Sequence, residues 1–137
     1  MLKEASVAEL RSKGIEKECR VLVNRGRGND ELAPSEALYR DLQSRKSQLE
    51  KGLGKGSPEA HNAAFLECDY ERRFREQIAT DAAALAKLEH LARRSEHEDV
   101  YLVCYEGLTK ACHRRILLRI AGEDFGAQVA VDGIEPR

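Results

Sequence analysis

The sequence contains no long apolar run. None of its segments reaches the roughly 18 uncharged apolar residues that a membrane-spanning helix needs. Residues 1–14 (MLKEASVAELRSKG) also lack the apolar stretch of a secretory signal peptide. We therefore expect a cytoplasmic protein that has no membrane partner.

The chain also lacks an excess of charge of either sign. Its 23 Lys and Arg residues nearly balance its 24 Asp and Glu residues, which gives a formal net charge of -1. General binders of nucleic acids and of anionic membranes carry a basic excess. The balance therefore argues against nucleic acid as a partner, although it leaves room for a local basic patch.

Cysteines are few, and no two of them form a CxxC pair. The four are Cys19, Cys68, Cys104 and Cys112. Such wide spacing does not resemble the disulfide framework of a small secreted protein. Cys19 and Cys68 are expected to be core or half-buried side chains. Because 137 residues suffice to bury a core, the sequence calls for no cofactor and no metal.

Short apolar runs alternate with longer helical patterns along the chain. Strands are expected at residues 2–5, 20–23, 99–105 and 127–131. Strands that alternate with helices favour a mostly parallel sheet covered by helices. The expected fold is one small α/β domain with three to four strands. The expected helices cover residues 7–13, 35–50, 58–78, 81–92 and 112–121.

Local signals define the ends of several helices. Ser6 and Glu9 have the spacing of a capping box in front of the first helix. Thr80 is the expected N-cap of the helix that follows it. Two apolar stripes meet near Asp69, so we expect a bend in the long helical segment there.

Ligands of open parallel sheets bind at the carboxyl ends of the strands. Two loops satisfy that rule here, namely residues 24–30 and residues 105–111. The first carries Arg25 and Arg27, which are candidate ligand-binding residues or simply a solvated basic loop. Both loops are expected to contribute charged groups to one crevice.

The second loop leads into a cluster of chemically active residue types. Cys104 and Glu106 point to the same side of an extended chain. Cys112, His113 and Arg114 begin the next helix, where free N–H groups favour an anion. Arg114 is the candidate ligand-binding residue, because its guanidinium can donate two hydrogen bonds to a carboxylate or phosphate. Cys104 and Cys112 are both candidate catalytic thiols, and Cys112 is the more plausible nucleophile because helix N-termini favour thiolates. Glu106 or His113 is the candidate proton carrier.

Three more specific sites are set aside on the sequence alone. Neighbouring side chains on a helix diverge by about 100°, so Cys112 and His113 are not expected to form a catalytic pair. Cys104, Cys112 and His113 supply a poor ligand set for zinc. A phosphatase-like loop needs Arg six residues after Cys104, where this chain has Lys110. A purely structural role for the whole cluster stays open.

Other polar groups have weaker signals. His61 and Asn62 lie near a helix start, where side chains often bond to the backbone. Arg72 and Arg73 lie on a charged helix face that is usually solvated surface. They also form the basis of an alternative function, a non-catalytic module that binds a protein or nucleic-acid partner through the helical faces of residues 35–94.

Several of these segments resemble one known family. The segment VYLVCYEGLTKACHRRILL (residues 100–118) resembles the signature of the Domain of Unknown Function 488 family, in which C-x-E is followed by C-H-R. ELAPS at residues 31–35, HNAAF at 61–65 and DYERRF at 69–74 are similar to further parts of that family. The resemblance implies a compact α/β domain of a cytoplasmic, prokaryotic-type protein, and it brings no catalytic assignment.

The sequence therefore leads to two hypotheses about function. The first is binding or turnover of a small anionic ligand, which carries phosphate or carboxylate, at the strand-to-helix turn of residues 104–114. The alternative is the interaction module without catalysis.

Overall fold

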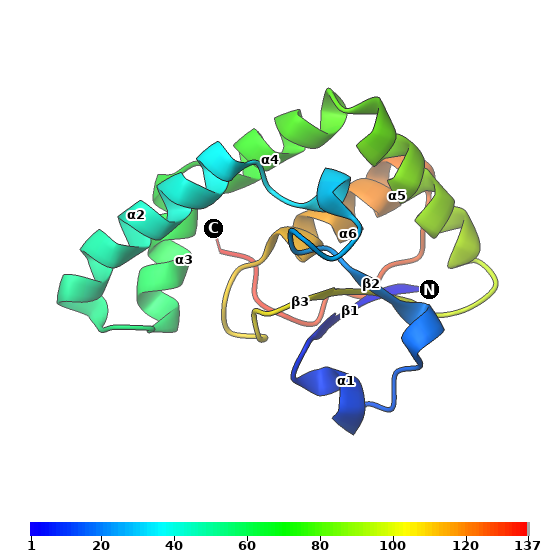
Figure 1. Ribbon diagram of the computed structural model, residues 1–137, viewed down its shortest axis with the longest axis horizontal. Coiled ribbons are helices and arrows are strands. Elements are labelled where there is room, and N and C mark those ends of the chain that lie inside the picture. The colour runs from blue at the N-terminus through cyan, green and yellow to red at the C-terminus, as the bar shows by residue number, and fades with distance from the viewer. Residues whose placement is uncertain (137) are drawn as a thin grey trace.

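A three-stranded parallel sheet forms the centre of the computed structural model, which describes residues 1–136 (Figure 1). The strands are β1 (Leu2–Ser6), β2 (Arg20–Leu22) and β3 (Val100–Cys104), and their order is β1-β3-β2. Ser6 pairs with Cys104, and Leu22 pairs with Val103. The carboxyl ends of all three strands therefore lie at the same edge of the sheet.

The apolar run of residues 99–105 forms the central strand because it is apolar on both faces. Leu102 belongs to the larger hydrophobic core, while Val103 belongs to a smaller one with Ala5 and Ile15. Alternate residues of a strand face opposite sides, so each side of β3 needs its own apolar cover. This agrees with the expected buried parallel strand.

Helices cover both faces of the sheet, but unequally. In Figure 1, α1 (Glu9–Ser12) lies on one side, and α4, α5 and α6 lie on the other. The helices α2 and α3 pack against each other and form an arm that extends beyond the sheet. The later helices are α2 (Glu36–Leu53), α3 (Pro58–Glu67), α4 (Tyr70–Ala79), α5 (Ala82–Arg94) and α6 (His113–Phe125), and short 3-10 turns lie at Lys17–Cys19 and Asp30–Leu32.

Local hydrogen bonds set the helix starts, and the starts of α1 and α5 differ from the expected caps. The first helix begins at Glu9, because Ser6 remains in β1 and donates its N–H to Glu9 Oε1. Asp81, and not Thr80, caps α5, because its carboxylate accepts the free N–H groups of the first turn. The Thr80 hydroxyl instead donates to the Glu76 carbonyl in α4. The bend at Asp69 is confirmed, since this residue has a φ of 53°.

The strand expected at residues 127–131 is reduced to one parallel bridge, between Leu2 and Val129. Leu2 donates its N–H to the Gln128 carbonyl and accepts from Ala130 N–H. The backbone pairing with β1 then stops, because the N–H groups of Asp132 and Gly133 bond to the Glu4 carboxylate instead. The segment therefore closes the edge of the sheet without becoming a fourth strand.

Two further expectations concern exposure. Cys19 and Cys68 are half-buried, as expected. Among the helices of residues 1–136, none combines the length and the apolar character needed to cross a membrane.

Candidate functional site

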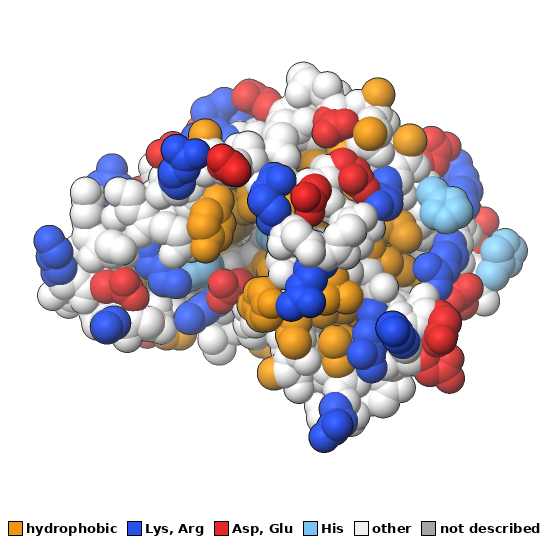
Figure 2. Space-filling model, in the orientation of Figure 1, with side chains coloured by type: hydrophobic (Ala, Val, Ile, Leu, Met, Phe, Trp, Pro, Cys, Tyr) orange, Lys and Arg blue, Asp and Glu red, His pale blue; other side chains and the backbone are white. Residues whose placement is uncertain are grey.

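A cavity of about 330 Å³ lies at the carboxyl edge of the sheet. Its walls come from the segment after β2, the α2–α3 arm, the start of α4 and the loop between β3 and α6. The face seen in Figure 2 is hollowed between the arm and the body that holds the sheet. The position agrees with the sequence expectation for this edge. Five of the candidate residues line the cavity: Arg25, Cys104, Glu106, Cys112 and His113.

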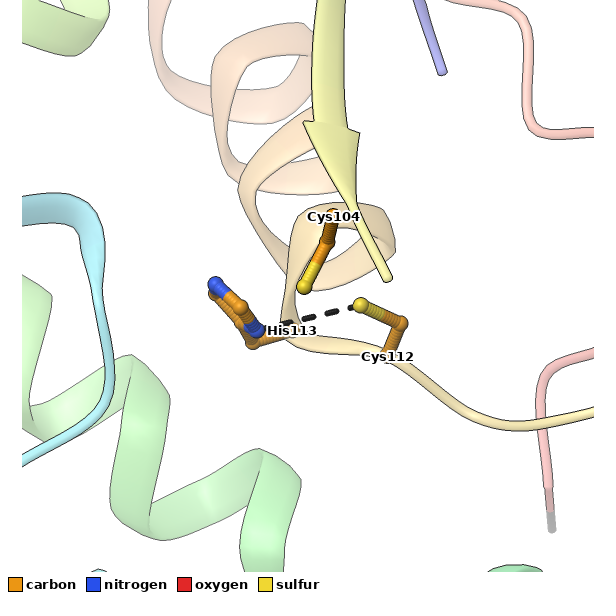
Figure 3. A group of neighbouring side chains, drawn as sticks. All are labelled: Cys104, Cys112 and His113. Carbon is orange, nitrogen blue, oxygen red and sulfur yellow. Dashed lines mark hydrogen bonds between the residues drawn. The ribbon is translucent and has the colours of Figure 1, made fainter. Parts of the chain in front are cut away.

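The floor of the cavity holds three buried donor groups that point toward one another (Figure 3). The two sulfur atoms of Cys104 and Cys112 and a ring nitrogen of His113 all lie within 4.8 Å of one another. The distance from Cys112 Sγ to His113 Nδ1 is 3.8 Å. We call these three residues the sulfur–imidazole cluster.

The expectation that Cys112 and His113 diverge is wrong. Cys112 is the N-cap of α6, with the extended dihedral angles φ -150° and ψ 144°. The rule of about 100° per residue holds only between two residues with helical dihedrals. The extended residue turns its side chain back toward the ring of the first helical residue, so the two groups are neighbours.

Two contacts orient the His113 ring. Its Nε2 lies 2.9 Å from the Val23 carbonyl oxygen, and its edge packs against Phe74 with ring centroids 5.5 Å apart. A carbonyl only accepts hydrogen bonds, so Nε2 carries the hydrogen. Nδ1, the other ring nitrogen, faces the sulfur of Cys112.

The two thiols have opposite electrostatic environments. Burial raises the pKa of Cys112, but the Cys104 thiol, His113 and Arg114 lower it further, so that it lies well below its ordinary value. The hydrogen bond to Cys112 and burial both raise the pKa of Cys104. Of the two thiols, Cys112 therefore has the lower pKa and more readily carries a negative charge.

Arg114 does not reach the cavity, contrary to the expectation. Its side chain is 0% exposed, and Nε donates to Glu4 Oε1 at 2.9 Å. Nη1 and Nη2 have no hydrogen-bond partner among the described residues. Because Arg114 follows His113 in the helix, it points toward β1 instead of the ligand. It acts on the cluster as a buried positive charge.

Glu4 is the group that sequence reasoning missed. Its carboxylate accepts from Arg114 and Arg115 and from the backbone N–H groups of Asp132 and Gly133. The available signal was a glutamate within the strand expected at residues 2–5. It indicates a buried partner of opposite charge, but it does not say which of the many arginines that partner is.

The two arginines of the first loop differ in position. Arg25 lines the cavity, and its Nη2 donates to the Pro34 carbonyl at 2.8 Å. Arg27 does not line the cavity and donates to the hydroxyl of Tyr105 at 2.9 Å. Arg25 is therefore the better placed of the two to meet a ligand.

His61 and Asn62 bond to the backbone, as expected, and they hold the loop in front of α6. His61 Nε2 lies 2.8 Å from the Ala111 carbonyl oxygen. The Asn62 side chain donates to the Thr109 carbonyl and accepts from Ala111 N–H. His61 also lines the cavity, and burial lowers its pKa, so its ring is neutral.

The charged helix face considered for partner binding is largely paired within the chain. Arg72 bonds to Asp69 and Glu76, and Arg73 bonds to Asp41 across the helix interface. These contacts agree with the expectation of ordinary helical surface.

Comparison with known families adds one finding. A family model with the description "Active DUF488-N3 subclade" matches residues 4–123, a range that contains every residue lining the cavity. The match confirms the resemblance carried by the C-x-E and C-H-R residues. The chain has no match among curated proteins and none among solved structures.

Proposed function

The chain belongs to the DUF488 family, and on that premise we propose that it binds and transforms a small molecule carrying a phosphate or carboxylate group. The observation that carries the proposal is the sulfur–imidazole cluster at the floor of a cavity at the carboxyl edge of the sheet. Such clefts are the usual ligand sites of open α/β sheets.

Two features favour an anionic group at this position. The 13-residue helix α6 begins at the cavity, and no side chain caps its first turn. Its free N–H groups and its dipole favour negative charge. Arg25 contributes a guanidinium from the opposite loop. The anionic group of the ligand would lie between these two positive ends.

The remaining wall suits the organic part of a ligand. Leu42 and the stacked rings of Phe65 and Tyr70, whose centroids are 4.2 Å apart, contribute apolar surface. Cavities that bind small molecules combine such apolar walls with a few polar groups. The volume of about 330 Å³ fits a ligand of modest size.

The cluster supplies the reacting groups of the proposed site. Cys112 would be the nucleophile, because its sulfur lies at the start of α6 and accepts the thiol hydrogen of Cys104. Its sulfur would bond to an electrophilic carbon or phosphorus, and the leaving group would depart with the bonding electrons. Glu106 would carry a proton to that group, and water would then release the product from the sulfur.

A ligand screen tests the proposal. Metal-free, reduced protein is mixed with inorganic phosphate, nucleotides, sugar phosphates and short carboxylates, and thermal unfolding is recorded. A ligand at 100 times its dissociation constant adds about 2.7 kcal/mol of stability, which corresponds to a rise of roughly 5 °C or more. In Arg25→Ala, we expect binding to weaken by about tenfold, the equivalent of about 1.4 kcal/mol.

Two variants serve as controls for the screen. Arg72→Ala removes an exposed arginine that does not line the cavity and should bind like the wild type. Cys112→Ser should still bind the ligand but lose turnover. The proposal fails if no compound stabilises the wild type, or if Arg25→Ala and Arg72→Ala give the same shift.

A further inference from the structure

We propose that the sulfur–imidazole cluster is also a binding site for Zn²⁺, and that the bound ion blocks Cys112 as a nucleophile. The sequence favoured no metal here because Cys104, Cys112 and His113 supply only three ligands, a poor set for zinc. The structure brings them together, and this convergence carries the inference. Zinc binding goes beyond the proposed function and does not depend on it, whereas the block of Cys112 as a nucleophile rests on that function.

The spacing of the donor atoms is close to that of a zinc site. With Zn–S near 2.3 Å and Zn–N near 2.0–2.1 Å, tetrahedral geometry places neighbouring ligand atoms roughly 3.6–3.8 Å apart. Cys112 Sγ and His113 Nδ1 are 3.8 Å apart, and all three donors lie within 4.8 Å of one another. Only small side-chain rotations would bring them around one ion.

The hydrogen bond of His113 to the main chain is a second, independent observation. Histidines that bind metals usually donate their other ring N–H to a carbonyl or carboxylate, which fixes the tautomer and the ring orientation. Here the Val23 carbonyl accepts from Nε2 at 2.9 Å. Nδ1 therefore faces the sulfur of Cys112 and could coordinate an ion without any rearrangement of the ring.

The donor set selects the kind of ion. Two cysteine sulfurs and one imidazole are soft or borderline ligands, which suit zinc and not magnesium or calcium. Two thiolates also neutralise the charge of Zn²⁺, so the bound ion and its two sulfur ligands carry no net charge together. All three residues line the cavity, and the fourth coordination position would open into it. Three protein ligands and one open position are typical of non-structural zinc sites.

The consequence for Cys112 follows from coordination. A sulfur that shares its lone pair with Zn²⁺ is a poorer nucleophile, and the ion also occupies the space in front of it. Zinc binding and the proposed attack by Cys112 are therefore mutually exclusive. Free zinc would inhibit the reaction of this site, and a chelator would restore it.

Titration of the reduced full-length chain with Co²⁺ tests the site, because cobalt bound by thiolates absorbs strongly in the near ultraviolet. We expect this absorption to saturate at one ion per chain and to disappear when Zn²⁺ is added. It should be lost in Cys104→Ser and Cys112→Ser. Cys19→Ser and Cys68→Ser are matched controls, since these half-buried thiols lie outside the cluster, and they should keep it.

Protection from alkylation is measured on the wild-type protein, so it tests the zinc site even if a cluster variant fails to fold. Wild-type protein is treated with iodoacetamide with and without Zn²⁺, and each cysteine is quantified by mass spectrometry. Zinc should protect Cys104 and Cys112 but leave Cys19 and Cys68 unaffected. The zinc site is refuted if no cobalt–thiolate absorption arises, or if zinc gives equal protection to all four cysteines. The ligand screen uses metal-free protein, so its outcome is separate.

Discussion

The carboxylate of Glu4, in the middle of β1, offsets two buried arginines. It accepts hydrogen bonds from Nε of Arg114 and Nε of Arg115, each at 2.9 Å. Two guanidinium groups and one carboxylate leave an excess positive charge in a buried region. A negative charge on Cys112 would offset this excess, which agrees with the lowered pKa of its thiol.

Replacing Glu4 by glutamine should therefore destabilise the protein strongly. Breaking a buried ion pair from one side costs about 3–5 kcal/mol, because the other charge stays buried without a partner. Urea denaturation at neutral pH measures this loss. Glu71→Gln is the control, since its pair with Arg119 is partly exposed and should cost about 1 kcal/mol or less. Equal losses in the two variants would contradict the role given to Glu4.

At the scale of single elements, Glu9 stabilises the turn from β1 into α1. Its carboxylate accepts from Ser6 N–H at 2.9 Å and pairs with Lys13 Nζ at 2.8 Å. Burial raises the pKa of Glu9, but the hydrogen bonds from Lys13 and Ser6 lower it further, from 4.5 to about 2. Of the two hydrogen bonds of a capping box, the one from Ser6 N–H to the Glu9 carboxylate is thus present even though Ser6 belongs to the strand.

The lowered pKa of Glu9 predicts a pH-dependent contribution to stability. Because the folded-state value lies below the unfolded one, the contribution is complete above pH 4.5 and is lost as the pH falls through about 2. Glu9→Gln should lower the free energy of unfolding by about 1–2 kcal/mol at pH 7. Urea midpoints at pH 7, 4 and 2.5 should show the difference shrinking.

A matched exposed glutamate separates this effect from a general loss of charge. Glu89 pairs with Arg93 on the surface of α5, and Glu89→Gln should change stability by less than about 0.5 kcal/mol at any pH. A difference for Glu9→Gln that persists undiminished at pH 2.5 would show that its carboxylate does not have the lowered pKa.

At the scale of the whole molecule, the segment after α6 holds the C-terminal end of the described chain against β1. It bonds to Leu2 through the backbone, and its N–H groups at Asp132 and Gly133 reach the Glu4 carboxylate. Arg115 donates to the carbonyl of Ile134. Residues more than 100 positions apart in the sequence thus share the network behind the cavity.

The close approach of this segment to Arg115 makes Gly133 sensitive to substitution. A Cβ atom at Gly133 would overlap the Arg115 guanidinium, which is fixed by its bonds to Glu4 and to backbone carbonyls. We expect Gly133→Ala to cost about 1–3 kcal/mol, measured by thermal unfolding. A Cβ atom at Gly122, a residue of α6, would lie at ordinary van der Waals distances from Ala127 and Val129. Gly122→Ala should therefore be neutral or stabilising. A neutral Gly133→Ala would contradict the tight packing.

Local sequence patterns were enough to predict several parts of the structure. The largely apolar residues 99–105 predict a strand, and the structure places it at the centre of the sheet. The C-x-E and C-H-R residues placed the candidate site at the carboxyl end of this strand, where the cavity lies, and indicated the family. A helix start after residue 111 also followed from local composition.

The arrangement of the side chains in the site depends instead on contacts between distant segments. The direction of Cys112 depends on extended dihedrals at a helix boundary, and a shift of one residue there changes which groups meet. Arg114 is buried because its partner, Glu4, lies 110 positions away in another element. His113 is oriented by a carbonyl of a third segment. Such long-range pairings leave no periodic trace in a single sequence, whereas apolar periodicity does.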